Sequence, residues 1–347
     1  MTELPPPSLR LDFDAEALAA NWRTLDRMSG SAAAGAAVKA DGYGLGAGRV
    51  ASVLAGAGAR DFYVAHWSEV PAVTAEVASS QVAVLHGPLT DADCAFARAS
   101  GVRPVLNSLA QVARWQASGG GLCDLMVDTG INRLGVPLSS LGDPSLSGLE
   151  IDTLMSHLAS ADEDSTLNTL QAERFAQVCA SLPARRRSLA NSAGIGLGAS
   201  FAFDVTRPGI SLYGGVPRAE FAGAIRQVAF PKAAVLQVRE VAAGEGVGYN
   251  AAFVALRSMR VGVVSLGYAD GFLRARGPGN ALKYQGEPLV LLGKVSMDMV
   301  VIDLSFAPKV GEGDWVDVPF DLPVEAARSG LSQYELLTTL GRRLRSS

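Results

Sequence analysis

The sequence predicts an α/β protein with an N-terminal (β/α)8 TIM-like barrel and a C-terminal mostly β domain. Eight short apolar or β-branched runs alternate with helix-periodic segments over the first two thirds of the 347 residues. Each interval is long enough for a crossover helix. After Pro231, alternating and apolar stretches are separated by Gly-rich turns, which is typical of a β-rich domain. We therefore expect a barrel domain over 1–225 and a β-rich domain over 226–347.

The eight runs are the expected barrel strands, and helical periodicity between them predicts crossover helices. The carboxyl ends of barrel strands form the active-site face, so polar side chains gathered at the run ends indicate a site. We interpret His66 and His86 as structural histidines. The runs are 33–39, 62–66, 82–86, 103–106, 122–128, 151–157, 187–191 and 209–213, and the helical segments include 14–27, 49–57, 109–116 and 167–182. The polar residues at or near run ends are Lys39, His66, His86, Asn107, Asp128, His157, Ser192 and Arg207.

The second domain is expected to be built from strands, with a short terminal segment of helical pattern at 335–345. Gly-rich turns such as 244–246 and 277–279 separate the strands. The expected strands are 233–238, 260–266, 289–292, 299–304 and 315–318.

Composition excludes several classes of protein. The net charge is −4 and no basic run is longer than 185–187, so nucleic-acid binding has no electrostatic footprint. The widely spaced Cys94, Cys123 and Cys179 contain no CxxC pair, which predicts neither a disulfide framework nor a zinc site. No segment has the pattern of a signal peptide or a membrane span. We expect a soluble cytoplasmic protein without a membrane partner or a metal.

Lys39 is the chemically most informative residue of the barrel half. Every other cation before Lys232 is an arginine, so Lys39 is expected to do what a guanidinium cannot. A desolvated lysine amine loses its proton and forms imines with carbonyl groups. Lys39 lies between an apolar run and the Gly-rich segment 40–44, where a covalently held carbonyl cofactor is expected. The alternative is a solitary lysine whose ammonium reaches solvent from a strand end.

Eight motifs along nearly the whole chain resemble, in order, those of the alanine racemases, a family that uses pyridoxal phosphate (PLP). The resemblance implies racemisation of L- and D-alanine for peptidoglycan synthesis. The motifs are AVKADGYGLG at 37–46, VDTGINRLG at 127–135, SHLA at 156–159, NSA at 191–193, RPGISLYG at 207–214, GY at 248–249 followed by GYADG at 267–271, and GKVSMD at 293–298.

The resemblance implies two bases, because inversion at Cα needs an acid/base group on each face. Lys39 matches the lysine that holds PLP and serves as one base, and Tyr249 matches the other. Without the resemblance, Tyr249 reads as an ordinary strand tyrosine. A tyrosine is a poor base at its usual pKa near ~10, so a neighbouring cation or hydrogen-bond donor would have to favour its phenolate.

Further residues match the family's cofactor and substrate contacts. Arg207 matches the arginine that faces the pyridine nitrogen, and an ion pair with Asp204 is the alternative. His157 matches the histidine that packs on the ring. The expected phosphate ligands are the amides of Gly209 and Ile210 and the hydroxyls of Ser192 and Tyr43. Arg133 and Met297 match residues near the substrate carboxylate, although a methionine alone suggests a buried packing role.

Two positions depart from the family pattern. Met126 stands where many members carry a carbamylated lysine that holds the arginine matching Arg133, so a bound anion or another carboxylate would have to position Arg133. Arg342 lies near the place of a phosphate-contacting tyrosine.

The resemblance also implies a homodimer, in which Lys39 and Tyr249 of different subunits complete each active site. A racemase with broader specificity, acting on alanine and serine, is the alternative enzyme. A related PLP-dependent decarboxylase fits the Arg207 and Tyr249 segments less well. A non-catalytic PLP-binding protein built on a bare barrel would lack the second domain.

Overall fold

A computed structural model of the chain describes residues 5–277 and 279–345. They form two compact units, Ala15–Arg226 and the combination of Met1–Asp14 with Gln227–Ser347. Strand β1 (Leu9–Phe13) pairs antiparallel with β12 (Ala229–Val241), so the beginning of the chain lies in the second unit and not in the barrel expected over 1–225. Leu9 and Leu11 are buried while Arg10 between them is exposed, and this alternation fits an antiparallel strand covered on one side.

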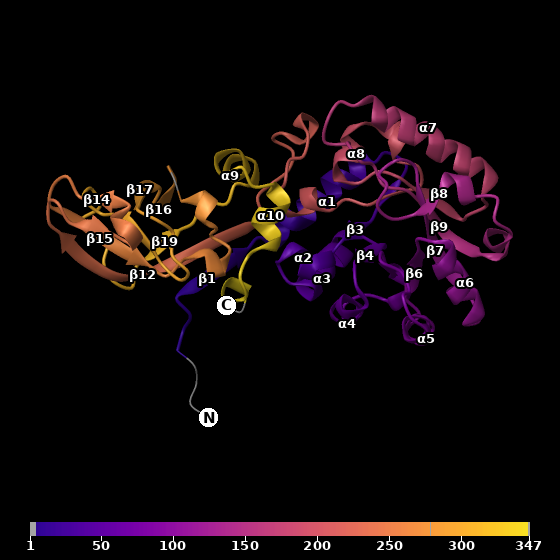
Figure 1. The fold of residues 1–347 in the computed structure, drawn as a ribbon, viewed down its shortest axis with the longest axis horizontal. Helices are drawn as coiled ribbons and strands as arrows, with labels where there is room; N and C mark the ends of the chain where they lie inside the picture. The colour runs from indigo at the N-terminus through magenta and orange to yellow at the C-terminus, as the bar shows by residue number, and fades with distance from the viewer. Residues whose placement is uncertain (1–4, 278, 346–347) are drawn as a thin grey trace. The chain divides into compact units, whose positions relative to one another are not determined.

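The first unit is a parallel barrel, which confirms the predicted fold class (Figure 1). Its strands pair in the order β10-β9-β7-β6-β5-β4-β3, and β11 pairs parallel with β2. A parallel bridge from Asn191 to Arg207 joins the β10 side to β11. The strands are β2 (Ala33–Ala34), β3 (Ala36–Ala37), β4 (Phe62–Val64), β5 (Val82–Val84), β6 (Arg103–Leu106), β7 (Leu122–Asp128), β8 (Val136–Pro137), β9 (Glu150–Met155), β10 (Arg186–Ser188) and β11 (Val205–Thr206).

Two of the expected strands differ in the structure. The last barrel strand is Val205–Thr206, and the expected strand 209–213 is instead a 3-10 helix, Ile210–Tyr213. The expected strand 33–39 ends at Ala37, and Lys39 begins the short helix α2. Both errors have one cause, because a short apolar run bounded by glycine has no period that separates a strand from a turn of helix.

Helices cover the outside of the barrel, and several begin at side-chain caps. Thr90 and Ser108 accept hydrogen bonds from the backbone of α5 and α6, which satisfies amides that have no partner within the helix. The helices are α1 (Ala15–Met28), α2 (Lys39–Tyr43), α3 (Ala47–Ala57), α4 (Val70–Thr74), α5 (Asp91–Ser100), α6 (Leu109–Ala117), α7 (Thr166–Ser181) and α8 (Ser192–Gly196). The four helical segments expected from periodicity correspond to α1, α3, α6 and α7.

The second unit is a mostly antiparallel sheet (Figure 1). In its described part, strands follow the order β1-β12-β15-β18-β17-β16-β19, and β19 also pairs with β12. Its remaining strands are β13 (Gly246–Val247), β14 (Phe253–Val254), β15 (Met259–Val264), β16 (Ala281–Tyr284), β17 (Glu287–Leu292), β18 (Val300–Asp303) and β19 (Trp315–Asp317). Helices α9 (Leu322–Ser329), α10 (Gln333–Thr338) and α11 (Arg342–Arg345) follow.

Candidate active site

Lys39 opens a left-handed turn immediately after β3. Ala40, Asp41 and Gly42 have φ angles of 53°, 55° and 63°, a conformation that costs free energy for residues other than glycine. Side-chain acceptors hold this turn. Glu69 Oε1 accepts the Ala40 N–H at 2.6 Å, and Asp41 Oδ1 accepts the Ala47 N–H at 2.9 Å. The backbone at Lys39 is therefore held at the carboxyl end of strand β3.

Positive groups surround the Lys39 amine. Burial is the main cause that lowers its pKa, and Arg133 and Arg207 lower it further, while Glu69 opposes them. Burial, with Arg207, Arg133 and Lys39, also lowers the pKa of His157 to about 3. These four side chains are thus close enough to act on one another. A neutral imidazole and a lysine that loses its proton readily suit a site for an anionic carbonyl cofactor.

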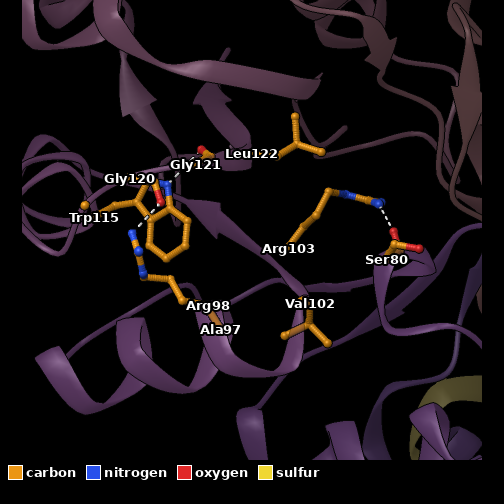
Figure 2. A pocket seen from close by; sticks show the side chains of 11 residues that line it. Ser80, Ala97, Arg98, Val102, Arg103, Trp115, Gly120, Gly121 and Leu122 are labelled. Atoms are coloured by element: carbon orange, nitrogen blue, oxygen red, sulfur yellow. Dashed lines mark hydrogen bonds between the residues drawn. The ribbon is translucent and has the colours of Figure 1, made fainter.

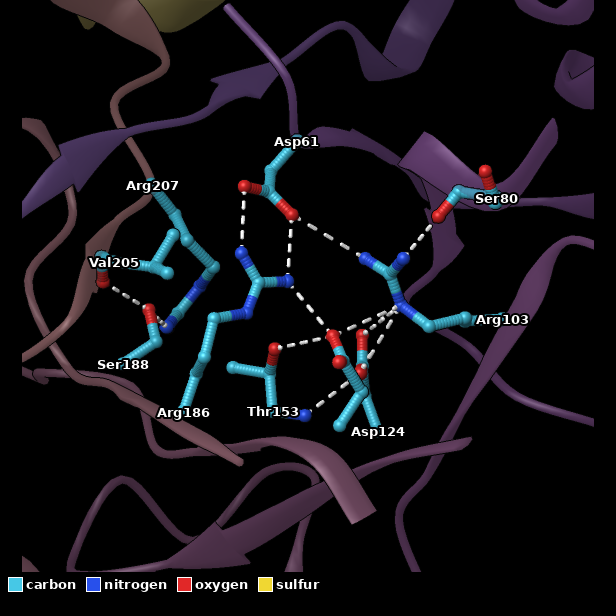
Figure 3. Close-up of polar contacts among 10 residues, drawn as sticks. Asp61, Ser80, Arg103, Asp124, Thr153, Arg186, Ser188, Val205 and Arg207 are labelled. Carbon is cyan, nitrogen blue, oxygen red and sulfur yellow. Dashed lines mark hydrogen bonds and ion pairs between the residues drawn. The ribbon is translucent and has the colours of Figure 1, made fainter. Parts of the chain in front are cut away.

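Arg207 is buried and directed by hydrogen bonds, not by a carboxylate. Its backbone N–H donates to Ala190 O at 2.8 Å. Its guanidinium donates to Ser188 Oγ (Figure 3) and to Ser156 O. The alternative ion pair with Asp204 is wrong, because the Asp204 carboxylate accepts from Arg187. Among the described residues Arg207 has no ion-pair partner. The positive charge of Arg207 can therefore interact with a bound group at the carboxyl end of the barrel strands.

Ser192 and the segment 209–211 bring hydroxyl and backbone N–H groups together in a small cradle. Ser192 Oγ accepts N–H groups from Gly209 at 2.8 Å and from Ser211 at 3.3 Å. The Gly209 amide, expected to meet a phosphate, is therefore used inside the protein. Within the described chain, the buried Ser211 Oγ has no hydrogen-bond partner.

Tyr43 lies against this cradle. A Cβ placed on Gly209 would be 2.2 Å from Tyr43 Oη. The Tyr43 ring stacks on Tyr213 with centroids 4.6 Å apart, and Tyr213 Oη donates to Ala37 O at 2.8 Å. The buried Ser211 hydroxyl without a hydrogen-bond partner, next to Gly209 where there is no room for a side chain, fits a phosphate-sized anion. These residues can therefore hold the group that Lys39 suggests.

Asp128 shapes the loop that carries Arg133. Its Oδ1 accepts N–H groups from Gly130, Ile131 and Asn132 at 2.8, 3.0 and 3.2 Å. Asn132 is in the left-handed region with φ 54°. Arg133 is exposed, and Met126 is buried at 7% exposure. No carboxylate of the described residues forms an ion pair with Arg133.

Tyr249 and Met297 belong to the second unit and both are exposed, at 65% and 53%. Tyr249 is not in a strand, because β13 ends at Val247 and a 3-10 helix begins at Tyr249. Asn250 and Ala251 after it have positive φ angles of 63° and 45°, a strained turn of the kind that gathers at functional sites. The exposure of Met297 contradicts the buried packing role that residue type alone suggests.

Comparisons with known proteins show the family of the chain. Residues 13–217 match the family profile described as alanine racemase, N-terminal domain, and residues 228–347 match the alanine racemase C-terminal domain. The chain belongs to the alanine racemase family.

Relatives and solved structures in the alanine racemase family resemble the chain over nearly its full length. It is 39% identical to an alanine racemase of Acidiphilium cryptum, over 96% of this chain and 97% of the relative. It is 41% identical to one of Methylobacterium nodulans, over 99% and 96%. An alanine racemase structure from Bartonella henselae with covalently bound pyridoxal phosphate superposes with a TM-score of 0.90 at 33% identity, covering 98% and 99% of the two chains.

Sequence reasoning missed a network of buried charges at the other end of this family member's barrel (Figure 3). Arg186 donates two hydrogen bonds to Asp61, at 2.7 and 2.8 Å, and one to Asp152. Arg103 forms ion pairs with Asp61, Asp124 and Asp152. These residues lie at or near the beginnings of barrel strands, where residues stabilise the fold. The available signal was a charged residue at or near the start of several of the apolar runs.

A cavity of about 410 Å³ lies next to this network (Figure 2). Arg103 and Leu122 line it, and they are the first residues of β6 and β7. The cavity is therefore at the opposite strand ends from Lys39, and the candidate site does not include it. Its other lining residues are Ser80, Ala97, Arg98, Gly101, Val102, Trp115, Gly119, Gly120 and Gly121.

The helices of the described residues do not include a possible membrane span. Across residues 5–277 and 279–345, none of them has the length and apolar character needed to cross a bilayer. The three cysteines are free.

Proposed function

We propose that this chain is a PLP-dependent alanine racemase that interconverts L- and D-alanine with Lys39 and Tyr249 as its two bases. The observation that carries the proposal is the Lys39 amine, whose pKa is lowered by burial, Arg133 and Arg207 at the carboxyl end of the barrel. Membership of the family supports it, and so does the covalently bound pyridoxal phosphate of the Bartonella henselae relative.

PLP, when bound, supplies the electron sink that acidifies the Cα proton of an amino acid. The residues present fit this group. Lys39 would hold it covalently, Ser192, Ser211, the Ile210 amide and Tyr43 would meet its phosphate, and His157 would lie against its ring. Because a guanidinium stays protonated and can only donate, Arg207 would donate to the ring nitrogen without giving up its proton.

The bases act from opposite faces of the substrate. Lys39 Nζ would take or return the proton on one face, and Tyr249 Oη would do so on the other. The Arg133 guanidinium and the backbone at Met297 would orient the substrate carboxylate. Neutral His157, with a pKa of about 3, adds no charge that would compete for the carboxylate.

The active enzyme is proposed to be a homodimer in which each site takes Lys39 and Tyr249 from different subunits. Large apolar side chains exposed on the second unit support a docked second copy, since such exposure marks interaction surfaces. They include Tyr249 at 65%, Val254 at 45%, Leu256 at 93%, Met297 at 53% and Phe306 at 87%. Mixing Lys39→Ala with Tyr249→Phe chains should restore activity through hybrid dimers. Demonstrated subunit exchange without recovery would contradict the shared site.

The product would supply D-alanine for peptidoglycan synthesis in the cytoplasm. The test is racemisation by the purified PLP-loaded protein of alanine, serine and lysine, with Lys39→Ala as the control. Alanine should be racemised fastest, and equal rates with serine would favour the broader-specificity alternative. Absence of Cα proton exchange with every substrate would overturn the proposal. Reduction with borohydride should fix the cofactor on Lys39.

A further inference from the structure

Three segments of the second unit contact one another, namely the turn 267–271, the C-terminal segment and the loop that contains Met297. The turn Gly267–Gly271 donates two backbone hydrogen bonds to this loop, from Tyr268 N to Ser296 O at 3.1 Å and from Ala269 N to Met297 O at 3.0 Å. The C-terminal segment joins the same turn, because Gly341 N donates to Asp270 O at 3.1 Å. The position of the Met297 loop therefore depends on the turn, and the turn contacts the end of the chain.

The contacts between these segments leave no room for side chains at two glycines. A Cβ on Gly267 would lie 2.1 Å from Met297 O, and a Cβ on Gly341 would lie 2.4 Å from Ala269 O. Both neighbours are backbone atoms, which cannot rotate away. Backbone packed this closely transmits a displacement of the turn directly to the Met297 loop.

Arg343 links all three segments through two carboxylates. Its Nε donates to Asp270 Oδ1 at 2.6 Å and its Nη1 donates to Asp298 Oδ1 at 2.8 Å. Asp270 is 1% exposed, and its other oxygen accepts the Gly267 N–H at 2.9 Å. Arg343 and Asp298 are about half exposed. The rigid fork of a guanidinium suits such a bridge, whereas a lysine ammonium is a point charge.

We propose that Arg343 is a positioning residue that holds the Met297–Asp298 loop, through Asp270 and Asp298, in the geometry that receives the substrate carboxylate. The role rests on the proposed function of Met297. Arg343 acts in two ways. It fixes the loop, and it neutralises two aspartates that would otherwise repel a carboxylate arriving at the adjacent backbone.

The inference predicts a specific kinetic change in Arg343→Gln of the holoenzyme. The KM for alanine should rise by about tenfold while kcat stays within about twofold, because the lost interaction concerns substrate binding. In Arg343→Lys the KM should rise less, because the lysine keeps the positive charge but lacks the guanidinium fork. Asp298→Asn added to Arg343→Gln should recover part of the KM, because it removes an unpaired negative charge.

Arg328→Gln is the matched control. Arg328 Nη1 pairs at 2.9 Å with Glu325, whose side chain is 1% exposed, so this variant also leaves a buried carboxylate less well paired in the same unit. It should lower Tm as Arg343→Gln does, without changing KM. An equal rise of KM in both variants would overturn the positioning role.

Amide hydrogen exchange provides a readout that does not need activity. Exchange over 294–300 should accelerate in Arg343→Gln and remain unchanged in Arg328→Gln. If the wild-type protein racemises no amino acid, the proposed function fails while the exchange data still decide whether Arg343 holds the loop. Unchanged exchange over 294–300, with normal racemisation by the wild type, would overturn this inference alone.

Discussion

Arg103 and Asp124 form a buried ion pair beneath the candidate site, with Nε 3.3 Å from Oδ1 and side chains 8% and 0% exposed. Arg103 also pairs with Asp61 and Asp152, so several carboxylates depend on one guanidinium (Figure 3). Removing one partner of a buried pair leaves an uncompensated charge.

Arg103→Met should therefore lower the free energy of unfolding by about 3–5 kcal/mol. The measurement is urea denaturation of the purified protein. Arg187→Gln is the control, because Arg187 and Asp204 form a pair 3.7 Å apart with both side chains more than a third exposed. It should cost no more than about 1 kcal/mol. Similar losses of unfolding free energy in the two variants would show that the buried network stabilises the protein no more than an exposed ion pair does.

Asp124 should make stability depend on pH in the direction opposite to that of an aspartate whose pKa is lowered by an ion pair. Burial raises its pKa to about 6 from the usual 3.8, although Arg103 and the Thr153 N–H oppose the shift. Between about pH 4 and 6 the folded state keeps this proton while the unfolded state loses it, so the contribution to stability is present below pH 4 and lost as the pH rises through 6.

The comparison with Asp124→Asn isolates this effect, because the amide oxygen can still accept the Thr153 N–H but does not titrate. The stability of the wild type relative to the variant should fall by roughly 2–3 kcal/mol between pH 4 and 7. Urea denaturation at several pH values measures it. A difference that is constant over this range would mean that Asp124 is already ionised at pH 4.

The order of elements and the motif positions could be predicted from the sequence, whereas the pairings that depend on distant contacts could not. The eight apolar runs located most barrel strands because buried parallel strands are continuous apolar segments. Val205–Thr206 has only two residues, too few to show a pattern. The pairing of Leu9–Phe13 with β12 joins positions more than 200 residues apart, and alternation alone does not reveal a partner.

In the candidate site, too, some residues could be predicted from the sequence, whereas contacts between distant segments could not. Lys39 was recognisable because its chemistry is rare in this half of the chain, and its neighbours were found by motif resemblance. The left-handed turn after Lys39, and the use of the Gly209 amide by Ser192, depend on acceptors supplied from other elements. Asp61, Arg103 and Arg186 each look like ordinary surface charges in the sequence, and only the closure of the barrel brings them together.

Asp128→Ala should disturb the candidate site through the Arg133 loop. The carboxylate accepts three consecutive N–H groups, and without it the positive φ of Asn132 has no local support. We expect kcat/KM for alanine to fall by about 10–100-fold, because misplaced binding groups cost that much, with a loss of roughly 1–2 kcal/mol in stability.

Asp143→Ala is a matched control for that variant. Asp143 Oδ1 accepts the Ser145 N–H at 2.9 Å and the Ser145 hydroxyl at 2.6 Å, so it also supports a local turn, but it carries no candidate site residue. It should lose comparable stability and retain normal kinetics. Normal kinetics in Asp128→Ala as well would show that the Asp128 loop does not position a group needed for activity.

Gly209→Ala should weaken PLP binding by displacing Tyr43. The added Cβ would lie 2.2 Å from Tyr43 Oη, and Tyr43 cannot retreat freely because its ring stacks on Tyr213, whose hydroxyl is bound to Ala37 O. The dissociation constant of PLP, measured by absorbance after the cofactor has been removed and added back, should rise by at least about tenfold, equivalent to ~1.4 kcal/mol.

Gly56→Ala is the control, since its Cβ would meet no atom of the described residues within 4 Å and alanine favours a helix by up to ~1 kcal/mol. Unchanged PLP affinity in Gly209→Ala would place the phosphate away from this cradle.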